Sequence, residues 1–487
     1  MQFERKVSQK PDLLLYIYYI TDFNKNKQTI KSILLYFSIL CYTNNEDSDN
    51  MLKLTNIEKE KFDKYVESHK TKSHFLQSLS WGEFSKAKKN LTPYYMGLIN
   101  DNDELVGATL LLQKHLPMGY SYFYAPRGFV IDYKKKELVK EMTEKVVSFA
   151  KSKKSIFVKI DPDLIKTRFN YLNEETPNPD YEELFNTLKS VGFKHQGFTK
   201  NFETMQPRYT FRIDLNQSLE EIESKFSKTT KQRIQKSKKL DTEVVIGTKD
   251  DVHEFYHLMT LTENRKDFIS YTEDYYQTLY EIFNNNKNSH ATLFLGKVHM
   301  DKTIEALEKN LKDVNDQISI LPVDNLSKSA KAKLAELTRQ KENITNDINK
   351  YKDYKKEYGD TVTLSAHMII EYGDKAWVLY AGNHNILSET YVNYNTYFEH
   401  IKYCKEKGIK IYDQFGTIGD LSENNPRLGL HEFKKKFGGD YVEFIGEWDY
   451  VTNKFMYFVF TKLVPLYRKM IRKKSKKVLQ NEISESK

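Results

Sequence analysis

Two histidines and a glutamate stand at a spacing that can bind zinc. His253, Glu254 and His257 belong to the sequence His-Glu-Phe-Tyr-His, which on a helix places both imidazoles on one face and offers the glutamate as a general base. A zinc peptidase needs a third ligand, which Glu273 or Glu281 would have to supply. We expect no metal, because the apolar residues of this helix predict a buried stripe that leaves both histidines on a different, solvated face: Val252, Phe255 and Met259.

A run of basic residues is the strongest candidate for binding a polyanion. Lys228 and Lys231 would share one helix face with Gln232 and Gln235. Clustered lysine and arginine side chains neutralise phosphates, so the pattern favours a nucleic-acid backbone as partner. A solvated charged surface is the alternative. The run comprises Lys225, Lys228, Lys231, Arg233, Lys236, Lys238 and Lys239.

The C-terminal segment, residues 456–487, reads as a basic amphipathic tail. Apolar side chains at a membrane interface can enter the headgroup region while basic ones pair with anionic lipid. Alternatively, the aromatic residues complete a core and the lysines form a solvated end. No apolar run in the chain reaches the ~20 residues that cross a bilayer, so we expect a cytoplasmic, peripherally membrane-associated protein. The residues concerned are Phe455, Met456, Phe458, Val459 and Phe460, then Arg468, Lys469, Arg472, Lys473 and Lys474.

The composition is that of a globular protein of a reducing compartment. Its 487 residues, 39% of them hydrophobic, suffice for two or three domains, and the net charge of +9 favours anionic partners. Cys41 and Cys404 are far apart, which argues against a disulfide framework. Neither a P-loop nor a Gly-x-Gly-x-x-Gly turn is present, nor is the pyrophosphate-binding loop of acetyl-CoA enzymes. We therefore expect no cofactor.

An α/β fold has to position these residues. Strand-like runs alternate with helical stretches from Met51 to about residue 193, and the alternation restarts at about residue 209. We expect two domains, residues 51–195 and 196–455. Residues 1–50 differ in character and are expected to lie outside the native chain, with a membrane-touching extension as the alternative. The predicted strands are 94–99, 105–112, 120–124, 156–160, 209–213, 242–246, 291–297, 364–372 and 375–380.

Residues 302–358 interrupt the second domain with two heptad-like registers. Apolar residues that recur every three or four positions predict two helices packed along a seam, here an antiparallel coiled-coil arm. Such an arm could contact RNA, form a dimer or act as a stiff spacer. The first register is Ile304, Leu307, Leu311, Val314, Ile318 and Leu321; the second is Ala330, Leu334, Leu337, Ile344, Ile348 and Tyr351, with Lys341 at one seam position.

Motifs along most of the chain resemble the Fem family of peptidoglycan bridge aminoacyltransferases, especially its FemX and MurM types. The resemblance runs from about residue 51 to the mid-460s, with the inserted coiled coil also typical of the family. The motifs are FLQSLSWGEF (75–84), LPMGYSYFYAPRGFVIDY (116–133), FVKIDPD (157–163), QPRYTFRIDL (206–215), KTTKQRIQKSKK (228–239), WVLYAGN (377–383), YDQFGT (412–417) and GLHEFKKKFGG (429–439).

This resemblance implies two GNAT-like domains facing each other across a channel, without metal or nucleotide cofactor. The implied reaction moves glycine, alanine or serine from aminoacyl-tRNA onto the stem-peptide amine of lipid II or a related precursor. It also implies tRNA as the polyanion that meets Lys228, Lys231, Arg233 and Lys236, contact with the inner membrane leaflet, and homo- or hetero-oligomers with related transferases. An aminoacyl ester is already activated, so positioning and oxyanion stabilisation can carry most of the catalysis.

Three residues match the family's reaction site. Lys434 matches a lysine that faces the channel, where an ammonium could stabilise an oxyanion or hold the terminal phosphate of tRNA. Phe433 matches an aromatic residue of the same site, and Asp161 an aspartate considered as a base. The alternatives are a surface lysine run and an Asp-Pro turn after a strand.

The family's precursor-binding residues correspond to Lys86, Tyr275 and Tyr380 in this sequence. For the lysine, the alignment is uncertain by one position. A lysine there can pair with a pyrophosphate, and tyrosines can stack or donate hydrogen bonds, although core packing also explains them. Tyr271 stands where the family often has an arginine, which removes a bidentate phosphate clamp. The alternative function is therefore a catalytically weak accessory or immunity-type protein that binds tRNA.

Overall fold

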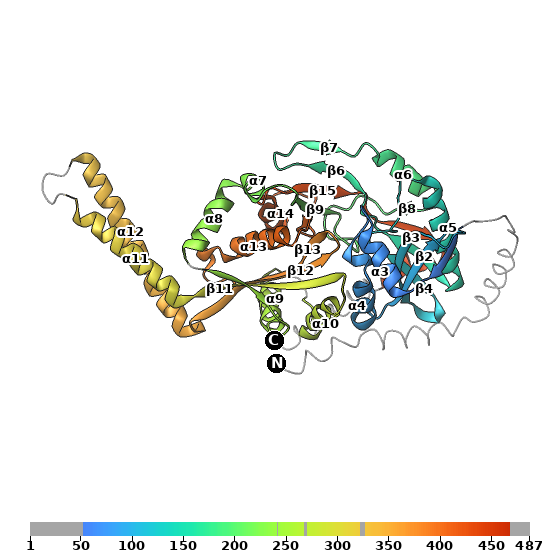
Figure 1. Cartoon of the computed structure of the whole chain (residues 1–487), viewed down its shortest axis with the longest axis horizontal. Coiled ribbons are helices and arrows are strands. Elements are labelled where there is room, and N and C mark those ends of the chain that lie inside the picture. Colours follow the sequence, from blue (N-terminus) through green and yellow to red (C-terminus); the bar gives the residue numbers. More distant parts are fainter. Residues whose placement is uncertain (1–51, 241, 267–269, 322–326, 468–487) are drawn as a thin grey trace, which may run out of the picture. The chain divides into compact units, whose positions relative to one another are not determined.

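The computed structural model describes residues 52–467 except 241, 267–269 and 322–326. Residues 1–50, which include Cys41, and the basic residues after position 467 lie outside this range, so the structure does not test what we expect of them. Two β-sheets with helices on their faces make up the described part, which is the predicted mixed α/β class (Figure 1).

The first sheet is mainly antiparallel, with β4 and β5 parallel. Side chains alternate between its faces, so Leu111 enters one core while Leu110 and Leu112 enter another. Its strand order is β1 (Lys53–Asn56), β2 (Thr92–Ile99), β3 (Leu105–His115), β4 (Ser121–Ala125), β5 (Ser155–Ile160), β16 (Trp448–Val451) and β8 (Lys194–His195).

The second sheet has more strands than the first, nine against seven. Among the described residues, its only parallel pair is β13 with β14. Its order is β10 (Glu243–Gly247), β11 (Ser289–His299), β12 (Thr361–Tyr372), β13 (Lys375–Asn383), β14 (Ile411–Asp413), β9 (Tyr209–Asp214), β15 (Asp440–Phe444), β6 (Ile165–Phe169) and β7 (Glu175–Pro177).

The two sheets exchange strands across the boundary expected at residue 195. The hairpin β6–β7 follows β5 in sequence, yet it pairs with β15 in the second sheet. Strand β16, near the end of the described chain, returns to pair with β5 and β8 in the first sheet. The two halves are therefore linked by backbone pairing as well as by the chain.

Helices cover both faces of the second sheet. Helices α9 (Val252–Lys266) and α10 (Glu273–Asn284) pack on the face of Leu293 and Met368, whereas α13 (Val392–Glu406) packs on the face of Phe294 and Ile369. The first core also contains side chains of α3 (Lys59–Ser68), α4 (Leu79–Lys89) and the first sheet, so it is shared between the halves. The described part also contains α5 (Lys136–Ser152), α6 (Tyr181–Ser190), α7 (Leu219–Ser224), α8 (Lys228–Lys239) and α14 (Leu428–Lys435).

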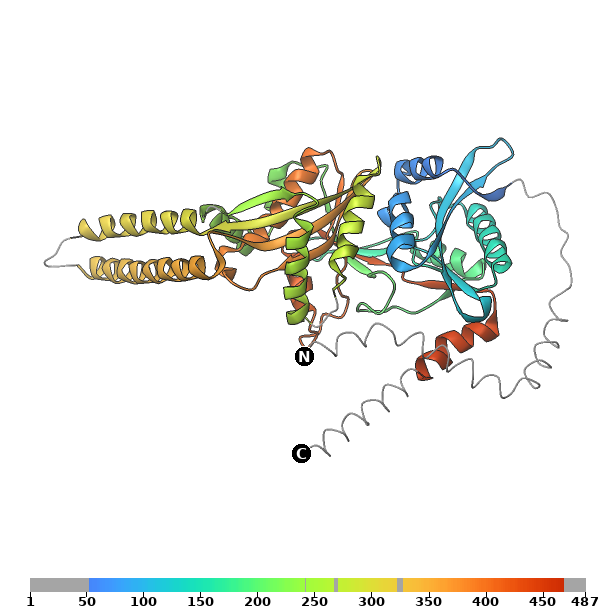
Figure 2. The ribbon, with the colours of Figure 1, turned by 90° about the horizontal axis from the view of Figure 1, so that it is seen from below.

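Two long helices, α11 (Met300–Ser319) and α12 (Lys328–Tyr358), join β11 to β12 and lie side by side in both views (Figures 1 and 2). Ile304, Leu307, Ile348 and Tyr351 are buried in one cluster between them. Lys352 pairs with Glu308 across the helices at 3.2 Å. The apolar spacing thus located the insertion and its two helices.

Helix α15 (Lys454–Phe458) follows β16 and continues as a π-helical turn (Val459–Leu463). Phe460 packs on Tyr122 and Phe157 of the first sheet, with ring centroids 5.8 and 6.0 Å away. Phe455 and Phe458 are instead 68% and 53% exposed. Within the described part of the chain, no helix is both long and apolar enough to span a membrane.

Candidate functional site

Lys434 lies near the end of α14, and only 5% of it is exposed. Its ammonium donates to the backbone carbonyls of Gln414 (2.6 Å), Phe415 (2.9 Å) and Gly416 (2.6 Å). An ammonium has three hydrogens, and three carbonyls accept them. Burial lowers the pKa of Lys434 to about 7, while nearby Asp413 and the carbonyl dipoles favour the charged form.

The loop that surrounds this ammonium has an unusual backbone. Phe415 (φ 44°) and Gly416 (φ 82°) are consecutive residues in the left-handed region. A non-glycine residue there costs about 1–2 kcal/mol. Asp413 offsets part of this cost, because its Oδ1 accepts the backbone N–H of Phe415 at 2.8 Å. The Phe415 ring is half-buried and lies 5.8 Å from the ring of Phe75, in the turn before α4.

Ion pairs connect this loop to the segment after β5. Arg212 donates from Nε to Asp413 (2.8 Å) and from Nη2 to Asp163 (2.8 Å). Although burial opposes ionisation, Arg212 holds the pKa of Asp163 well below its ordinary value. Lys72 donates to the Asp163 carbonyl at 2.6 Å, and burial lowers its pKa to about 8. These largely buried charges thus connect β9 and β14 of the second sheet to the segment that follows β5 of the first sheet.

Asp161 is two residues before Asp163, and both of its carboxylate oxygens accept hydrogen bonds. Its Oδ2 accepts from the Tyr124 hydroxyl at 2.9 Å, and its Oδ1 accepts from the Arg127 backbone N–H at 2.6 Å. Burial raises its pKa to about 7, although the Arg127 guanidinium opposes the rise. Asp161 therefore holds the Arg127 turn, where φ is 57°, and titrates near neutrality.

Phe433 packs into an aromatic cluster. Its ring centroid is 5.0 Å from Tyr394, 4.9 Å from Tyr397 and 5.4 Å from Phe437. These contacts belong to the core under α13. Phe433 thus packs α14 against the sheet.

The three tyrosines of the expected precursor site come together. The hydroxyls of Tyr275 and Tyr380 are 3.0 Å apart, and Tyr271 stacks on Tyr275 with centroids 3.8 Å apart and planes 6° apart. Tyr271 is 47% exposed. On α4, Lys86 is exposed, whereas Lys88 pairs with Asp274, directly before Tyr275. Lys88, which sequence reasoning missed, thus joins α4 to α10 through Asp274.

The basic helix α8 divides into exposed and engaged side chains. Lys228 and Lys236 are exposed, although the Lys236 ammonium lies 5.4 Å from the Tyr391 ring centroid, and Lys231 donates to the Ser224 carbonyl at 2.9 Å. Arg233 donates to the Tyr394 hydroxyl and lies 5.1 Å from the Tyr391 ring centroid. Arg233 therefore anchors α8 to α13 rather than presenting a free guanidinium.

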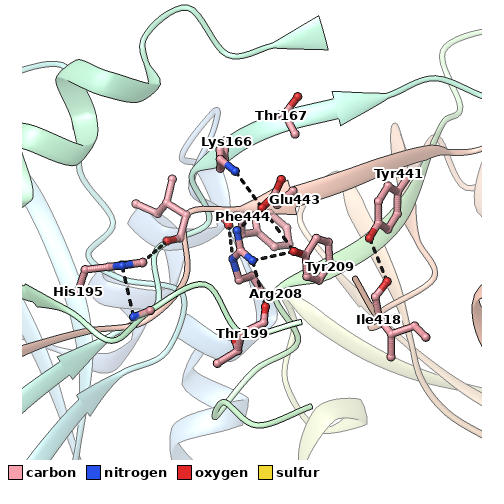
Figure 3. Close-up of polar contacts among 12 residues, drawn as sticks. Lys166, Thr167, His195, Thr199, Arg208, Tyr209, Ile418, Tyr441, Glu443 and Phe444 are labelled. Carbon is pink, nitrogen blue, oxygen red and sulfur yellow. Dashed lines mark hydrogen bonds and ion pairs between the residues drawn. The ribbon is translucent and has the colours of Figure 1, made fainter. Parts of the chain in front are cut away.

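Arg208, in the motif QPRYTF, is a buried hub that the sequence reading did not single out (Figure 3). It donates to the carbonyls of Phe444 (3.0 Å) and Thr199 (3.0 Å) and pairs with Glu443. Lys166 of β6 also reaches Glu443, at 3.2 Å. These contacts connect β9, β15 and the exchanged strand β6. An arginine directly before a predicted strand could have indicated such a buried ion pair from the sequence.

The zinc-spaced histidines lie on the surface, as the apolar stripe predicted. His253 and His257 are exposed, whereas Val252, Phe255 and Met259 are buried. His253 Nδ1 lies 3.2 Å from Glu273. Among the residues with described positions, no group of three or more His, Cys, Asp or Glu side chains is arranged to hold a metal ion.

Comparisons with known proteins agree with one another. The chain is 28% identical over 421 residues to aminoacyltransferase FemA of Staphylococcus epidermidis, covering 85% of this chain and 100% of that protein. It is 28% identical over 439 residues to lipid II:glycine glycyltransferase of Staphylococcus aureus, covering 87% and 98%. A crystal structure of FemX superposes with a TM-score of 0.68 at 25% identity, covering 84% and 99%. The sequence model of the FemAB family matches residues 57–464, and the chain therefore belongs to the FemAB family.

Proposed function

We propose that this chain transfers an amino acid from aminoacyl-tRNA to the stem-peptide amine of lipid II or a related peptidoglycan precursor, during formation of the interpeptide bridge. The chain is an acyltransferase by its family and relatives. The observation that carries the proposal is coverage: the similarity extends over 98–100% of two relatives named for this chemistry. Glycine, alanine and serine are the candidate amino acids.

The chemistry asks for a base, an oxyanion-stabilising group and an ordered pair of substrates. Asp161 is our candidate base, because a base acts most effectively when its pKa lies near the working pH. Lys434 belongs to the same proposed site, with Phe433 packing its helix in place, and the site would lie between two GNAT-like halves that exchange β6, β7 and β16 across the expected boundary of 51–195 and 196–455. No metal or nucleotide takes part in the proposed reaction.

For the donor, we propose that the exposed lysines of α8, Lys228 and Lys236, contact the tRNA backbone. Lys231 and Arg233 would support that surface through their contacts with Ser224 and Tyr394. The arm of α11 and α12, which we take as an antiparallel coiled coil, offers a second surface for tRNA or for another transferase chain.

For the acceptor, we propose the cluster of Tyr271, Tyr275 and Tyr380, with a lysine of α4 for the pyrophosphate. Lys86 is exposed, whereas the ammonium of Lys88 is already paired with Asp274 and would have to leave it. Because Tyr271 replaces a cationic clamp, we expect stacking to contribute more than charge to acceptor binding.

We also propose that α15 contacts the inner membrane leaflet, where a lipid-linked acceptor resides. Phe455 and Phe458 are large and exposed, and the segment that follows them in sequence is rich in lysine and arginine. Apolar insertion next to basic residues is the pattern of peripheral binding to anionic lipid.

The test is transfer of radiolabelled amino acid from a mixed aminoacyl-tRNA pool onto lipid II. We expect label on lipid II, strongly reduced in Lys434→Ala and retained in Lys435→Ala, its neighbour on the same helix. The label that appears on lipid II identifies which amino acid is transferred. The absence of transfer to plain lipid II and to lipid II with a partial bridge would contradict the proposal. Retained tRNA binding would then favour the accessory protein.

A further inference from the structure

The described part of the chain contains a cavity of about 290 Å³ that the proposed transfer does not use. Neither Asp161 nor Lys434 lines it. Its size is close to the ~300 Å³ at which pockets for small molecules begin. Its walls come from the tip of the β6–β7 hairpin, the end of β9, both sides of α7 and the start of β15, and include Tyr171, Arg212, Asp214, Gln217, Lys225 and Asp440.

Two carboxylates line this cavity, and neither is hydrogen-bonded to a cation among the described residues. Asp440 pairs with Arg168 at 3.9 Å, which is too long for a hydrogen bond. Asp214 accepts from the backbone N–H (2.9 Å) and the side-chain amide (2.7 Å) of Asn216, both at Oδ1. Burial raises the pKa of Asp440 against the effect of Arg168 and Lys225, and Asp214 adds to the rise. The two carboxylates are therefore close enough to repel each other, and a cationic group would stabilise both.

Lys225 brings the opposite charge to the same cavity. Its ammonium donates to the side-chain oxygen of Gln217, which is neutral, and lies 6.0 Å from the ring centroid of Tyr171. The charge of Arg212 is instead compensated, because this side chain pairs with two other carboxylates at 2.8 Å each. Lys225 is thus the lining cation whose hydrogen-bond partner could be exchanged for an anion.

This arrangement of charges discriminates between classes of ligand. The two carboxylates repel a simple anion such as phosphate, and Lys225 and Arg168 repel a simple cation. A molecule that carries both an ammonium and a carboxylate can pair with each group. The ring of Tyr171, a residue that is 43% exposed, offers an apolar surface to the rest of such a molecule.

We propose that this cavity binds a small zwitterion, of which a free α-amino acid is the simplest case. Its ammonium lies between Asp214 and Asp440, and its carboxylate pairs with Lys225. The ligand is not the proposed donor, because an aminoacyl ester has no free carboxylate. The site is therefore one for an effector, and its existence does not depend on the proposed transfer.

Isothermal titration calorimetry of the full chain tests the ligand class, with glycine, L-alanine and L-serine as probes. We expect saturable binding. The methyl esters lack the carboxylate and the N-acetyl derivatives lack the ammonium, so both should bind at least tenfold more weakly. Triglycine carries the same two charges further apart, and tighter binding of triglycine would identify the zwitterion as a peptide. Equal affinity for a zwitterion and either analogue, or no binding of any zwitterion, would overturn the proposal.

Variants test the location of the site. Asp440→Asn and Lys225→Met each remove one charge at nearly constant shape, and each should weaken binding of the best probe at least tenfold. Asp103→Asn and Lys140→Met, at exposed positions outside the cavity, are the matched controls and should keep the parent affinity. If a charge variant does not fold, Tyr171→Ala at the exposed hairpin tip replaces it and should also weaken binding.

Unchanged affinity in the folded cavity variants would place the binding elsewhere and overturn the proposal. Calorimetry needs no turnover. A chain that binds the zwitterion but transfers nothing would therefore count against the proposed function and not against this site.

Discussion

At the scale of single residues, the candidate site shows how burial changes the roles that residue types suggest. A lysine in a motif suggests a free cation, and an aspartate after a strand suggests a base or a turn. In the folded chain Lys434 is surrounded by carbonyls, and Asp161 accepts hydrogen bonds at both oxygens. Both pKa values move toward neutrality, to about 7, because burial disfavours charge.

The raised pKa of Asp161 predicts a pH-dependent stability. The folded chain holds this proton more tightly than the unfolded chain, in which the pKa is near 3.8. The stabilisation is therefore fully present below a pH of about 3.8, decreases as the pH rises above that value, and is lost once the pH has passed about 7. In Asp161→Asn this dependence disappears. Relative to that variant, the parent chain should lose about 2–3 kcal/mol of unfolding free energy between pH 5 and pH 8.

Denaturant unfolding at the two pH values measures this difference. Asn can still accept the Arg127 N–H, so we expect the variant to fold. The exposed loop variant Asp103→Asn serves as the control and should follow the parent chain. The difference in unfolding free energy between the parent chain and Asp161→Asn could instead be the same at both pH values. That result would show that the pKa of Asp161 is not raised in the folded chain.

At the scale of elements, the described lysines of α8 differ in what they are free to bind. Lys228 and Lys236 should each contribute about one unit to the slope of log affinity for tRNA against log salt, and their alanine variants should lower that slope. Arg233→Ala should instead lower the melting temperature, because the guanidinium anchors α8 on Tyr391 and Tyr394. Fluorescence anisotropy between 50 and 200 mM salt and thermal unfolding measure the two effects.

Lys140→Ala is the matched control for the salt dependence, because Lys140 is an exposed lysine on another helix, α5. Its slope should equal that of the parent chain. If the α8 variants also keep the parent slope, the basic run is a solvated surface and tRNA binds elsewhere.

Helix α15 makes a separate prediction about lipid binding. Replacing Phe455 and Phe458 by serine should weaken co-sedimentation with anionic vesicles by at least tenfold, because each exposed ring contributes about 1.5–3 kcal/mol when fully buried. The fold should be unaffected, since both rings are largely exposed. Tyr457→Phe is the control, because Tyr457 packs on Phe157 and donates to Asp449 within the protein, so its loss should change stability and not lipid binding. Equal binding of the double variant would mean that α15 does not enter the lipid.

At the scale of the whole described molecule, one shared core and the exchanged strands join the two sheets. Asp63 of α3 is buried and accepts the Tyr372 hydroxyl of β12 at 2.8 Å, the Leu79 N–H at 2.8 Å and the Asn288 amide at 2.9 Å. We therefore expect both sheets to unfold together, because neither can expose its share of this core alone.

Tyr372→Phe tests that cooperativity. It leaves one oxygen of a buried carboxylate with fewer donors, which should cost about 1–3 kcal/mol. Circular dichroism and tryptophan fluorescence should report the same, lowered transition midpoint. Tyr171→Phe, at an exposed hairpin tip, should leave the midpoint unchanged. Two separated transitions in the parent chain would mean that the halves fold independently.

The sequence by itself determined the features that depend on local periodicity. Alternating apolar residues located β2, β3, β4, β5 and the strands β9 to β13, and steps of three and four located α11 and α12. The stripe of Val252, Phe255 and Met259 correctly placed His253 and His257 on the surface. Motif content also identified the family, because its residues recur in order along most of the chain.

Only the tertiary structure decided which distant segments meet. The short strands β6, β7, β8, β14, β15 and β16 escaped prediction, because runs of two to five residues carry little periodic signal. Their pairing exchanges strands between the sheets, and a register between segments hundreds of residues apart leaves no local trace. For the same reason, the sequence showed Lys434 and Arg233 as cations but not their partners. Those partners arrive through the fold, and they determine whether each charge faces a ligand or the protein itself.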